Sequence, residues 1–437
     1  MRNTKIFPST NPSLFKKKAL QWAEIFPSQC LLDHNAYSDL SPHYLEGILA
    51  IDAEDRFDYF PSERRNGFEK LEDWLMQEKS WAFGFLSYDL KNEVEDLKSQ
   101  NPPLQAFPLI HFFRPKILIE FFANSIRISS NYVKPEHVFE QIQKVNPEFE
   151  EIRPLDNLDP NFDKKEYLET IKIIQDHIQF GDIYEMNFCM SYLAKEVGVH
   201  PRSLFNSLTG HSEAPFSAYF RMGDKYILSG SPERFLSKTG NRIVSQPIKG
   251  TRPRRDNIIN DEIERNTLQQ SPKDRSENVM IVDLVRNDLA RSCTPGSIKV
   301  EELFGIYSFK TVHQMISTIS GNLADGVTGI EAIRNAFPMG SMTGAPKIKA
   351  MQLIDQFERN SRGIYSGSIG YFTPEGDFDF NVVIRSILLD QAGRSLSFQV
   401  GGAIVADSIP ENEYQECLLK AEAMMRALGL EHLYAEA

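Results

Sequence analysis

The chain has 437 residues, a length that corresponds to two or three domains or to one large layered domain. Hydrophobic residues make up 41% of it and charged residues 25%, and these fractions exclude a disordered or fibrous protein. Acidic residues outnumber basic ones by 60 to 48, a net charge of -12, which argues against nucleic-acid binding because such proteins need a basic face. A small anionic ligand is compatible with this charge, since a local basic pocket can lie in an acidic protein.

The cysteines and the apolar runs indicate the compartment. The four cysteines lie far apart without a Cys-x-x-Cys pair, which argues against a disulfide scaffold and a thiolate zinc site. Residues 1–18 lack the apolar core and cleavage site of a signal peptide. The apolar run Ile117–Phe122 is too short for a membrane span. These features predict a reduced, cytoplasmic protein that does not cross a membrane.

A segment rich in proline and acidic residues divides the chain. Asn146–Asn161 has three prolines among its acidic residues, a composition typical of a connector. We therefore expect an N-terminal domain over residues 1–150, which holds all three tryptophans, and a second domain over residues 160–430.

Beyond the connector, the hydrophobic spacing predicts a helix followed by strands. Apolar residues recur at three-to-four spacing from Asp163 to Phe180, which predicts a helix there. The predicted strands are Tyr226–Leu228, Arg242–Val244, Ser366–Phe372, Phe378–Leu389 and Leu396–Val400. The turn at 374–377 predicts a hairpin between two of them. Strands joined by hairpins, with helices interspersed, predict the α+β class built on antiparallel sheet.

Two later helices each carry a pair of carboxylates. They are expected at Pro272–Arg291 and Pro410–Leu428, each with a proline in its first turn. The pairs are Asp274 with Glu277 and Glu413 with Glu416, three residues apart and therefore on one helix face. Carboxylates suit Mg²⁺, so the two helices would form a magnesium site if they met. The spacing does not show that they meet, and a solvated helix face is the ordinary alternative for either pair.

Two turns carry candidate catalytic residues. Ser229–Glu233 follows a predicted strand and places the carboxyl of Glu233 at a turn. In the turn Gln246–Arg254, Lys249 lies between Ile248 and a glycine, where the chain can approach a ligand closely. Burial lowers the pKa of a lysine and frees its amine, which makes Lys249 a candidate nucleophile. The alternatives are a solvated turn acid and a surface lysine.

Two glycine-containing segments and one arginine indicate an anion site. Gly340–Lys347 lacks the ending of a phosphate-binding P-loop, but its backbone amides can hold a carboxylate. Gly401–Ala403 follows a predicted strand. Arg385 lies inside a predicted strand, where it needs an anion from the protein or from a ligand. An ordinary flexible loop and a structural ion pair are the alternatives.

Taken together, these segments resemble the chorismate-utilising enzymes, and among them component I of the aminodeoxychorismate synthases, with component I of the anthranilate synthases close behind. The matching stretches are Pro247–Arg252, Val282–Leu289, Gly340–Lys347, Gly401–Ser408 and Glu413–Glu416. Their occurrence in this order over residues 160–430 is highly specific, whereas the first 150 residues resemble the family more weakly. The resemblance implies a large α/β sandwich of antiparallel sheets with helices outside.

The resemblance also implies roles for individual residues. Glu277 and Glu416 resemble direct Mg²⁺ ligands, and Asp274 and Glu413 resemble ligands that bind through water. The metal would hold the ring carboxylate of chorismate. Glu233 resembles the general acid that protonates the departing C4 hydroxyl. The implied substrate contacts are Lys420 at the ring carboxylate, Tyr365, Arg385, Gly401, Gly402 and Ala403 at the enolpyruvyl carboxylate, and Thr251 and Ser341 in the pocket wall.

A few positions separate the sub-families. Lys249 matches the aminodeoxychorismate synthases, because anthranilate synthases carry alanine there. Glu185 stands where glutamine is usual and where isochorismate and salicylate synthases have a lysine base, which disfavours attack of water at C2. Asn278 and Gln314 stand where histidine is common, and the adjacent His313 is expected to point elsewhere.

The sequence therefore predicts Mg²⁺-dependent amination of chorismate to 4-amino-4-deoxychorismate, for 4-aminobenzoate and folate synthesis. Lys249 would attack C2, and ammonia would then add at C4 and expel the lysine. The chain has no Gly-x-Cys-x-Gly turn of a glutaminase, so a separate glutamine amidotransferase subunit is expected to supply ammonia. The alternatives are anthranilate synthase component I and a non-catalytic regulatory protein that binds chorismate or an amino acid. Glu233 and the four metal-site acids count against the regulatory protein.

Overall fold

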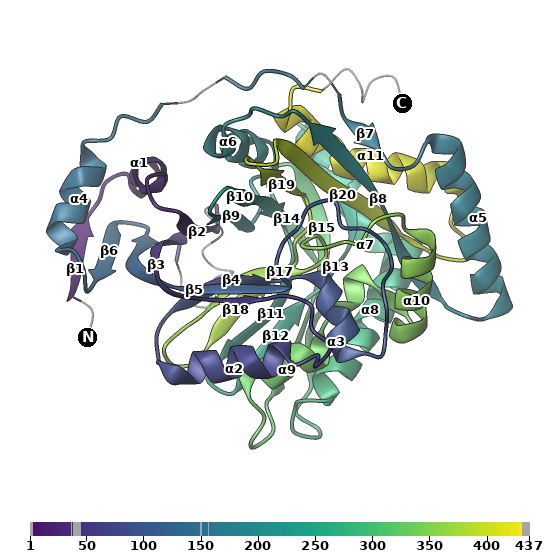
Figure 1. Ribbon diagram of the computed structural model, residues 1–437. Helices are drawn as coiled ribbons and strands as arrows, with labels where there is room; N and C mark the ends of the chain where they lie inside the picture. Colours follow the sequence, from purple (N-terminus) through teal and green to yellow (C-terminus); the bar gives the residue numbers. More distant parts are fainter. Residues whose placement is uncertain (1–2, 36, 38–44, 149–150, 156, 431–437) are drawn as a thin grey trace.

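A computed structural model describes residues 3–35, 37, 45–148, 151–155 and 157–430. Its strands form one network in which every pairing between named strands of the described residues is antiparallel. Helices lie on the outside of this network (Figure 1). The expected α+β class, with antiparallel sheets and outer helices, is confirmed.

The strands and helices have the following bounds. The strands are β1 (Asn3–Pro8), β2 (Ser28–Asp33), β3 (Gly47–Tyr59), β4 (Ala82–Leu86), β5 (Ile110–Phe122), β6 (Ser125–Ser130), β7 (Asp159–Pro160), β8 (Glu185–Lys195), β9 (Phe216–Met222), β10 (Lys225–Ser231), β11 (Arg234–Thr239), β12 (Arg242–Gln246), β13 (Ile248–Pro253), β14 (Lys299–Ser308), β15 (Val312–Asn322), β16 (Gly344–Ala345), β17 (Ser368–Phe372), β18 (Phe378–Asn381), β19 (Ser386–Asp390) and β20 (Ser395–Ile404). The helices are α1 (Pro12–Ala23), α2 (Gly67–Gln77), α3 (Lys91–Val94), α4 (Pro135–Gln143), α5 (Lys164–Phe180), α6 (Pro201–Ser212), α7 (Ile258–Gln270), α8 (Pro272–Ala290), α9 (Gly329–Ala336), α10 (Lys347–Phe357) and α11 (Pro410–Ala427), with short 3₁₀ helices η2 (Tyr88–Leu90) and η3 (Gly340–Met342).

Helix α5 shows how local sequence sets an element. Asp163 caps its first turn by accepting a hydrogen bond from the backbone of Glu166, whose side chain accepts one from the Asp163 backbone in return. The helix ends at Gly181, which has a left-handed φ of 93°. Its buried residues, Tyr167, Ile171 and Ile174, pack into the main core under β8 and β20. The predicted helix is therefore confirmed, as are α8 and α11 to within a residue at each end.

The predicted single strand Phe378–Leu389 is wrong. The chain forms β18 and β19 and leaves residues 382–385 outside any strand. Strand β18 pairs with β11 and β17, whereas β19 pairs with β10 and β20, so the chain changes partners between them. Arg385 lies at this change of partners with a left-handed φ of 52°, which interrupts the extended backbone.

Strands from the first part of the chain pair with strands from the second part. Strand β2 pairs with β9, and β4 pairs with β17, where Gly84 lies opposite Gly370. A Cβ at Gly84 would lie 2.1 Å from the carbonyl oxygen of His111, and one at Gly370 would lie 2.1 Å from that of Asp379. Side chains are therefore excluded at both positions, and neighbouring strands pack closely there.

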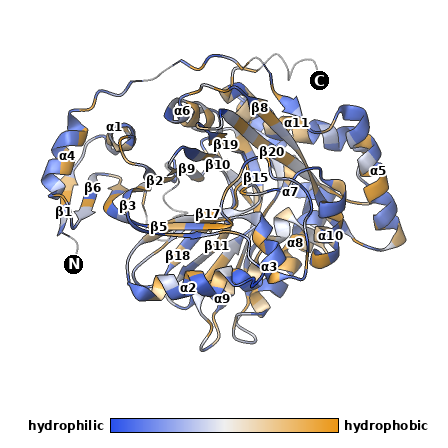
Figure 2. Cartoon of the chain, in the orientation of Figure 1, coloured by the Kyte–Doolittle hydropathy of each residue, from blue (hydrophilic) through white to orange (hydrophobic). Residues whose placement is uncertain are grey.

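The hydropathy of the residues follows the arrangement of inner strands and outer helices. Hydrophobic residues concentrate in the strands, and hydrophilic ones occupy the outward side of helices such as α2 (Figure 2). No helix within the described ranges is long and apolar enough to span a membrane. In the predicted connector 146–161, the described residues contain one short strand, β7, and positions 149, 150 and 156 lie outside the described residues.

We expect Asp163→Ala to lower the free energy of unfolding by about 1 kcal/mol, because the first turn of α5 loses its capping side chain. The measurement is urea unfolding followed by circular dichroism. Asp176→Ala is the matched control, since Asp176 is an exposed residue within the same helix and caps nothing. Equal stability of the two variants would contradict a role for the cap.

Candidate active site

Lys273 links helix α8 to an acidic residue of helix α11. The ammonium nitrogen of Lys273, on α8, lies 3.8 Å from Oε1 of Glu277 and 3.5 Å from Oε1 of Glu413, on α11. The structure thus brings Glu277 of one predicted pair and Glu413 of the other to the same lysine, which the sequence spacing could not show. The negative charges of Glu413, Glu277 and Glu416 raise the pKa of Lys273, although burial acts in the opposite direction.

These carboxyl groups are in different electrostatic states. Burial raises the pKa of Glu277 to about 7, whereas the Lys420 ammonium holds the pKa of Glu416 down at about 2. Oε1 of Glu413 accepts a hydrogen bond of 2.8 Å from the hydroxyl of Ser408. Oε1 of Glu277 and Oε2 of Glu413 are buried without a hydrogen-bond partner. Buried acceptor oxygens of this kind are stabilised by a cation.

The predicted ligand set fits a magnesium ion by donor type and by the buried Oε2 of Glu413, which has no hydrogen-bond partner. A Cβ at Gly402 would lie 3.5 Å from Oε2 of Glu413 and 3.6 Å from Oε1 of Glu416, so both carboxylates face strand β20. Asp274 contacts a different residue: its Oδ2 accepts a hydrogen bond of 3.3 Å from Arg252. Within the described residues, no three Asp, Glu, His or Cys side chains lie close enough together to hold a metal ion as they stand.

Glu233 and Ser341 lie together although they come from different elements. Glu233 follows β10, Ser341 lies in η3, and the Ser341 hydroxyl donates a hydrogen bond of 2.6 Å to Oε1 of Glu233. Burial raises the pKa of Glu233 to about 7, against the opposing effects of Ser341 and of the Lys249 charge. A cavity of about 20 Å³ borders both side chains, which is enough room for one water molecule. Glu233 is therefore suited to give up a proton near neutral pH.

Lys249 is buried at a β-bulge in strand β13. Between Ile248 and Thr251 the strand has one residue more than its partner β15, and Gly250 takes a left-handed φ of 90° there. The ammonium donates a hydrogen bond of 2.7 Å to Oε1 of Glu185, the first residue of β8. The alternative of a surface lysine is wrong, because Lys249 is only 9% exposed.

The expectation of a lowered pKa at Lys249 is also wrong. Burial does lower the pKa, but the negative charges of Glu185, Glu277 and Glu233 outweigh burial and leave the pKa above its ordinary value. Burial acts in the expected direction, but the carboxylates that face the amine come from β8, from α8 and from the turn after β10.

The predicted contacts to the substrate carboxylates lie around strand β20. The Lys420 ammonium donates to the carbonyl oxygen of Gly401 at 2.8 Å and pairs with Oε1 of Glu416 at 2.7 Å. Arg385 forms no ion pair with any described residue, which removes the structural ion pair as the explanation for its position. Burial lowers its pKa. Tyr365 is buried, and its hydroxyl contacts Sγ of Cys189 at 3.6 Å.

The remaining predicted residues lie on the sheet beside this group. Strand β20 places Gly401, Gly402 and Ala403 opposite residues of β8, and a Cβ at Gly401 would lie 2.4 Å from Sγ of Cys189. Thr251 lies on β13 opposite Gln314 of β15.

At the two positions where the resemblance implies histidine, this chain has Asn278 and Gln314. Oδ1 of Asn278 accepts a hydrogen bond of 2.6 Å from Ser317, and Oε1 of Gln314 is buried without a partner. His313 turns away, as expected, with its Nδ1 2.8 Å from the Ser308 hydroxyl.

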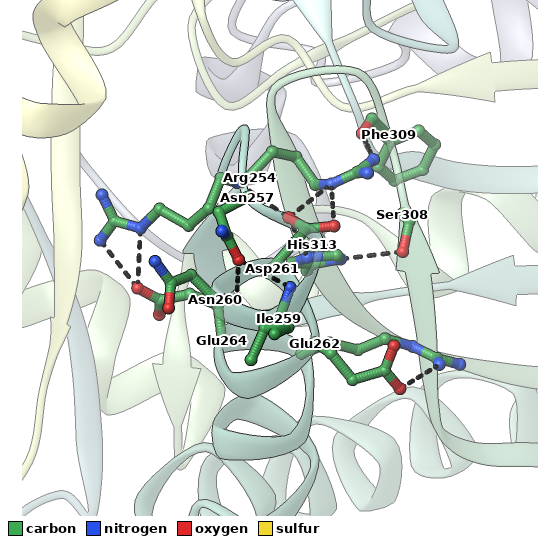
Figure 3. A network of polar contacts seen from close by, with 12 residues as sticks. Arg254, Asn257, Ile259, Asn260, Asp261, Glu262, Glu264, Ser308, Phe309 and His313 are labelled. Carbon is green, nitrogen blue, oxygen red and sulfur yellow. Dashed lines mark hydrogen bonds and ion pairs between the residues drawn. The ribbon is translucent and has the colours of Figure 1, made fainter.

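Figure 3 shows the network that holds His313. Its Nε2 lies 3.0 Å from Oδ1 of Asp261 at the start of α7, and the same carboxylate accepts hydrogen bonds from Arg254. The Arg254 guanidinium holds the pKa of Asp261 well below its usual range. Asn257 caps the helix through the backbone amides of Ile259 and Asn260. The network thus fixes α7 to β13 and β15 close to the Lys249 bulge, a contact that no sequence motif indicated.

Comparison with known proteins identifies the family. A family described as chorismate binding enzyme matches residues 34–426. The chain belongs to the chorismate-binding enzymes. Two similar proteins are aminodeoxychorismate synthases. The enzyme of Streptomyces griseus is 42% identical to this chain over 61% of its residues, and component 1 of the enzyme of Salmonella typhimurium is 41% identical over 61%. These alignments span only 36% and 58% of the two relatives.

Other chorismate-binding enzymes match more of the chain. Anthranilate synthase component 1 of Thermus thermophilus is 32% identical over 79% of the chain and 77% of its own length. The crystal structure of anthranilate synthase component I from Streptococcus pneumoniae superimposes with a TM-score of 0.77 at 25% identity, covering 86% of this chain and 91% of that one. MenF, the isochorismate synthase of Escherichia coli, has a TM-score of 0.75 at 16% identity over 98% and 95% of the two chains, which shows the shared fold.

Glu233 is expected to make stability depend on pH. Its folded pKa of about 7 lies above the unfolded value of 4.5, so the folded state binds the proton more tightly. This contribution is fully present below pH 4.5 and is lost as the pH rises to about 7, by about 3 kcal/mol. Glu233→Gln should therefore flatten the fall in unfolding free energy across this range, as measured by urea unfolding at each pH.

The exposed Glu169→Gln serves as the control and should leave the slope unchanged. A wild-type slope in the Glu233→Gln protein would show that Glu233 titrates normally.

Proposed function

We propose that this chain aminates chorismate at C4 in a Mg²⁺-dependent reaction and so forms 4-amino-4-deoxychorismate, the precursor of 4-aminobenzoate in folate synthesis. The observation that carries the proposal is that the buried amine of Lys249 shares one site with the carboxyl group of Glu233, whose pKa is about 7. Relatives near 40% identity named aminodeoxychorismate synthase support it.

Substrate binding would rest on the positive groups of the site. Arg385, without an ion pair of its own among the described residues, and Tyr365 would hold the enolpyruvyl carboxylate with the amides of Gly401–Ala403. Lys420 would lie near the ring carboxylate, and Thr251 and Ser341 would line the pocket. Mg²⁺ would be held by Glu277 and Glu416, with Asp274 and Glu413 binding through water. When bound, it would supply positive charge for the ring carboxylate.

The chemistry would use Lys249 as the nucleophile and Glu233 as the acid. The neutral amine of Lys249 attacks C2, the ring double bond shifts, and the C4 hydroxyl leaves as water with the proton of Glu233. Ammonia then adds at C4, and the bond between C2 and the lysine nitrogen breaks to release the amine. The added ammonia gives up a proton that restores Glu233, so the sum is chorismate and ammonia giving aminodeoxychorismate and water.

Anthranilate synthase component I is the second candidate, because that relative from Thermus thermophilus aligns with more of the chain. Lysine at position 249 and the absence of histidine at 278 and 314 favour amination without elimination of pyruvate. A regulatory protein without activity would not need a protonated Glu233 beside a buried amine.

Product identification separates the two enzymes. With chorismate, ammonium and Mg²⁺, we expect aminodeoxychorismate, which chromatography detects directly and which an added aminodeoxychorismate lyase converts to 4-aminobenzoate. Anthranilate as the product would establish the second candidate. No consumption of chorismate would leave only the regulatory protein.

The ammonia source is tested in the same assay. Glutamine should not replace ammonium until a glutamine amidotransferase subunit is added, because the chain has no glutaminase turn. Turnover of glutamine by the purified chain alone would contradict this.

Lys249→Ala should lower kcat by about 10³-fold or more, because the variant lacks the nucleophile. Chorismate should still bind, since its carboxylates are assigned to other residues. Residual activity could appear as direct attack of ammonia at C2, because alanine is the residue of anthranilate synthases at this position. The measurement is steady-state kinetics with product identification, and Lys299→Ala on the exposed strand β14 is the control. Wild-type kinetics in Lys249→Ala would remove the residue from the mechanism.

A further inference from the structure

The amine of Lys249 is held by one buried carboxylate. The distance from its nitrogen to Oε1 of Glu185 is 2.7 Å, and the Glu185 side chain is only 2% exposed. No other hydrogen bond of this ammonium occurs within the described residues. Glu277 on α8 and Glu233 after β10 also face the charge, and neither forms an ion pair with it.

The backbone fixes Glu185 in place. It starts β8 opposite Ala345 of β16, and the amides of Tyr184 and Asn187 donate to the carbonyl oxygens of Ala345 and Thr343. A Cβ at Gly344 would lie 2.2 Å from the carbonyl oxygen of Glu185, so the two strands could not approach this closely with a side chain there. The carboxylate is therefore part of a built site and not a mobile surface group.

The pair creates a requirement for the proposed chemistry. An ammonium has no lone pair, so Lys249 must lose a proton before its nitrogen can attack C2. Bulk water is a poor route for that proton because the nitrogen is buried. Oε2 of Glu185 has no hydrogen-bond partner, so the carboxyl group has a free acceptor site beside the amine.

We propose that Glu185 is the positioning residue and proton acceptor of Lys249, a role that rests on the proposed function. As Lys249 attacks C2, one N–H bond of its ammonium breaks and an O–H bond forms on Glu185. When ammonia expels the lysine from C2, the proton returns from Glu185 to the amine. The pair holds one proton before and after turnover, so no outside acid or base is required for this transfer.

The role predicts a specific pH signature. If the proton passes within the pair, wild-type kcat does not depend on bulk pH through Lys249. Glu185→Gln keeps a hydrogen-bond acceptor but cannot take the proton, so its kcat should follow the fraction of neutral amine. The ratio of the variant's kcat to that of wild type cancels the effect of Glu233, which both proteins share.

We expect this ratio to be about 10⁻² at pH 6.5 and to rise about tenfold per pH unit, while KM for chorismate changes little. If Glu185 is only a counter-charge, its removal lets the buried amine deprotonate more easily, and the ratio should instead exceed one and fall with pH. That result, or a ratio that is flat and near one, would overturn the proposal.

Two further variants make the result decisive. Glu185→Asp keeps a proton acceptor, so the ratio of its kcat to that of wild type should not change with pH, even if its kcat is lower. This variant still tests the role if Glu185→Gln folds poorly. Glu120→Gln is the matched control, because Glu120 is a buried glutamate that pairs with Arg127 on the sheet away from the site. If wild type shows no amination of chorismate, the proposed function fails and this role fails with it; a flat Glu185→Gln ratio in an active enzyme rejects this role alone.

Discussion

The site depends on keeping several carboxylates close together inside the protein. Like charges at short range repel strongly in a medium of low polarity, and each has lost part of its hydration. Three lysines from three elements offset this repulsion: Lys249 pairs with Glu185, Lys273 lies between Glu277 and Glu413, and Lys420 pairs with Glu416. Burial raises the pKa of Glu233 and of Glu277, which reduces the negative charge that these two groups carry near neutral pH. The arrangement therefore presents cations beside the acids, which the proposed dianionic substrate would require.

The sheet positions the charged residues of the site relative to one another. Strands β8 and β20 pair from Lys195 opposite Ser395 to Met186 opposite Ile404, and they carry Glu185 and Gly401–Ala403 at the same end of the pair. Helix α11 packs on β20, and its acids Glu413 and Glu416 lie against Gly402 of that strand. The β-bulge of β13 turns Lys249 inward toward β8. Backbone pairing thus sets the positions of Glu185 and Lys249, and the helices packed on the sheet place the other acids of the site.

The sequence predicted features that depend on neighbouring residues and missed those that depend on distant ones. The cap of α5 and its buried spacing are local, and so are the starts of α8 and α11, and these predictions are confirmed. The break at Arg385 was missed because it arises where the chain leaves β11 and β17 for β10 and β20. The pKa of Lys249 was predicted in the wrong direction because its partner Glu185 lies 64 positions earlier. Family motifs pointed to these acids as candidates, but they did not indicate the contacts of Glu277 and Glu413 with Lys273.

The joining of early and late strands has a consequence for how the chain reaches its native state. Strand β4 pairs with β17, and the hydroxyl of Ser87 donates to the carbonyl oxygen of Gly363 across 276 positions of sequence. Contacts of such separation must overcome a large loop-closure entropy before they contribute energy, so they form late and slowly. On the ribosome, the early strands emerge long before their partner strands are synthesised. The apolar edges of the early strands stay exposed during that time. The pairing of β4 therefore cannot be completed until synthesis has passed β17.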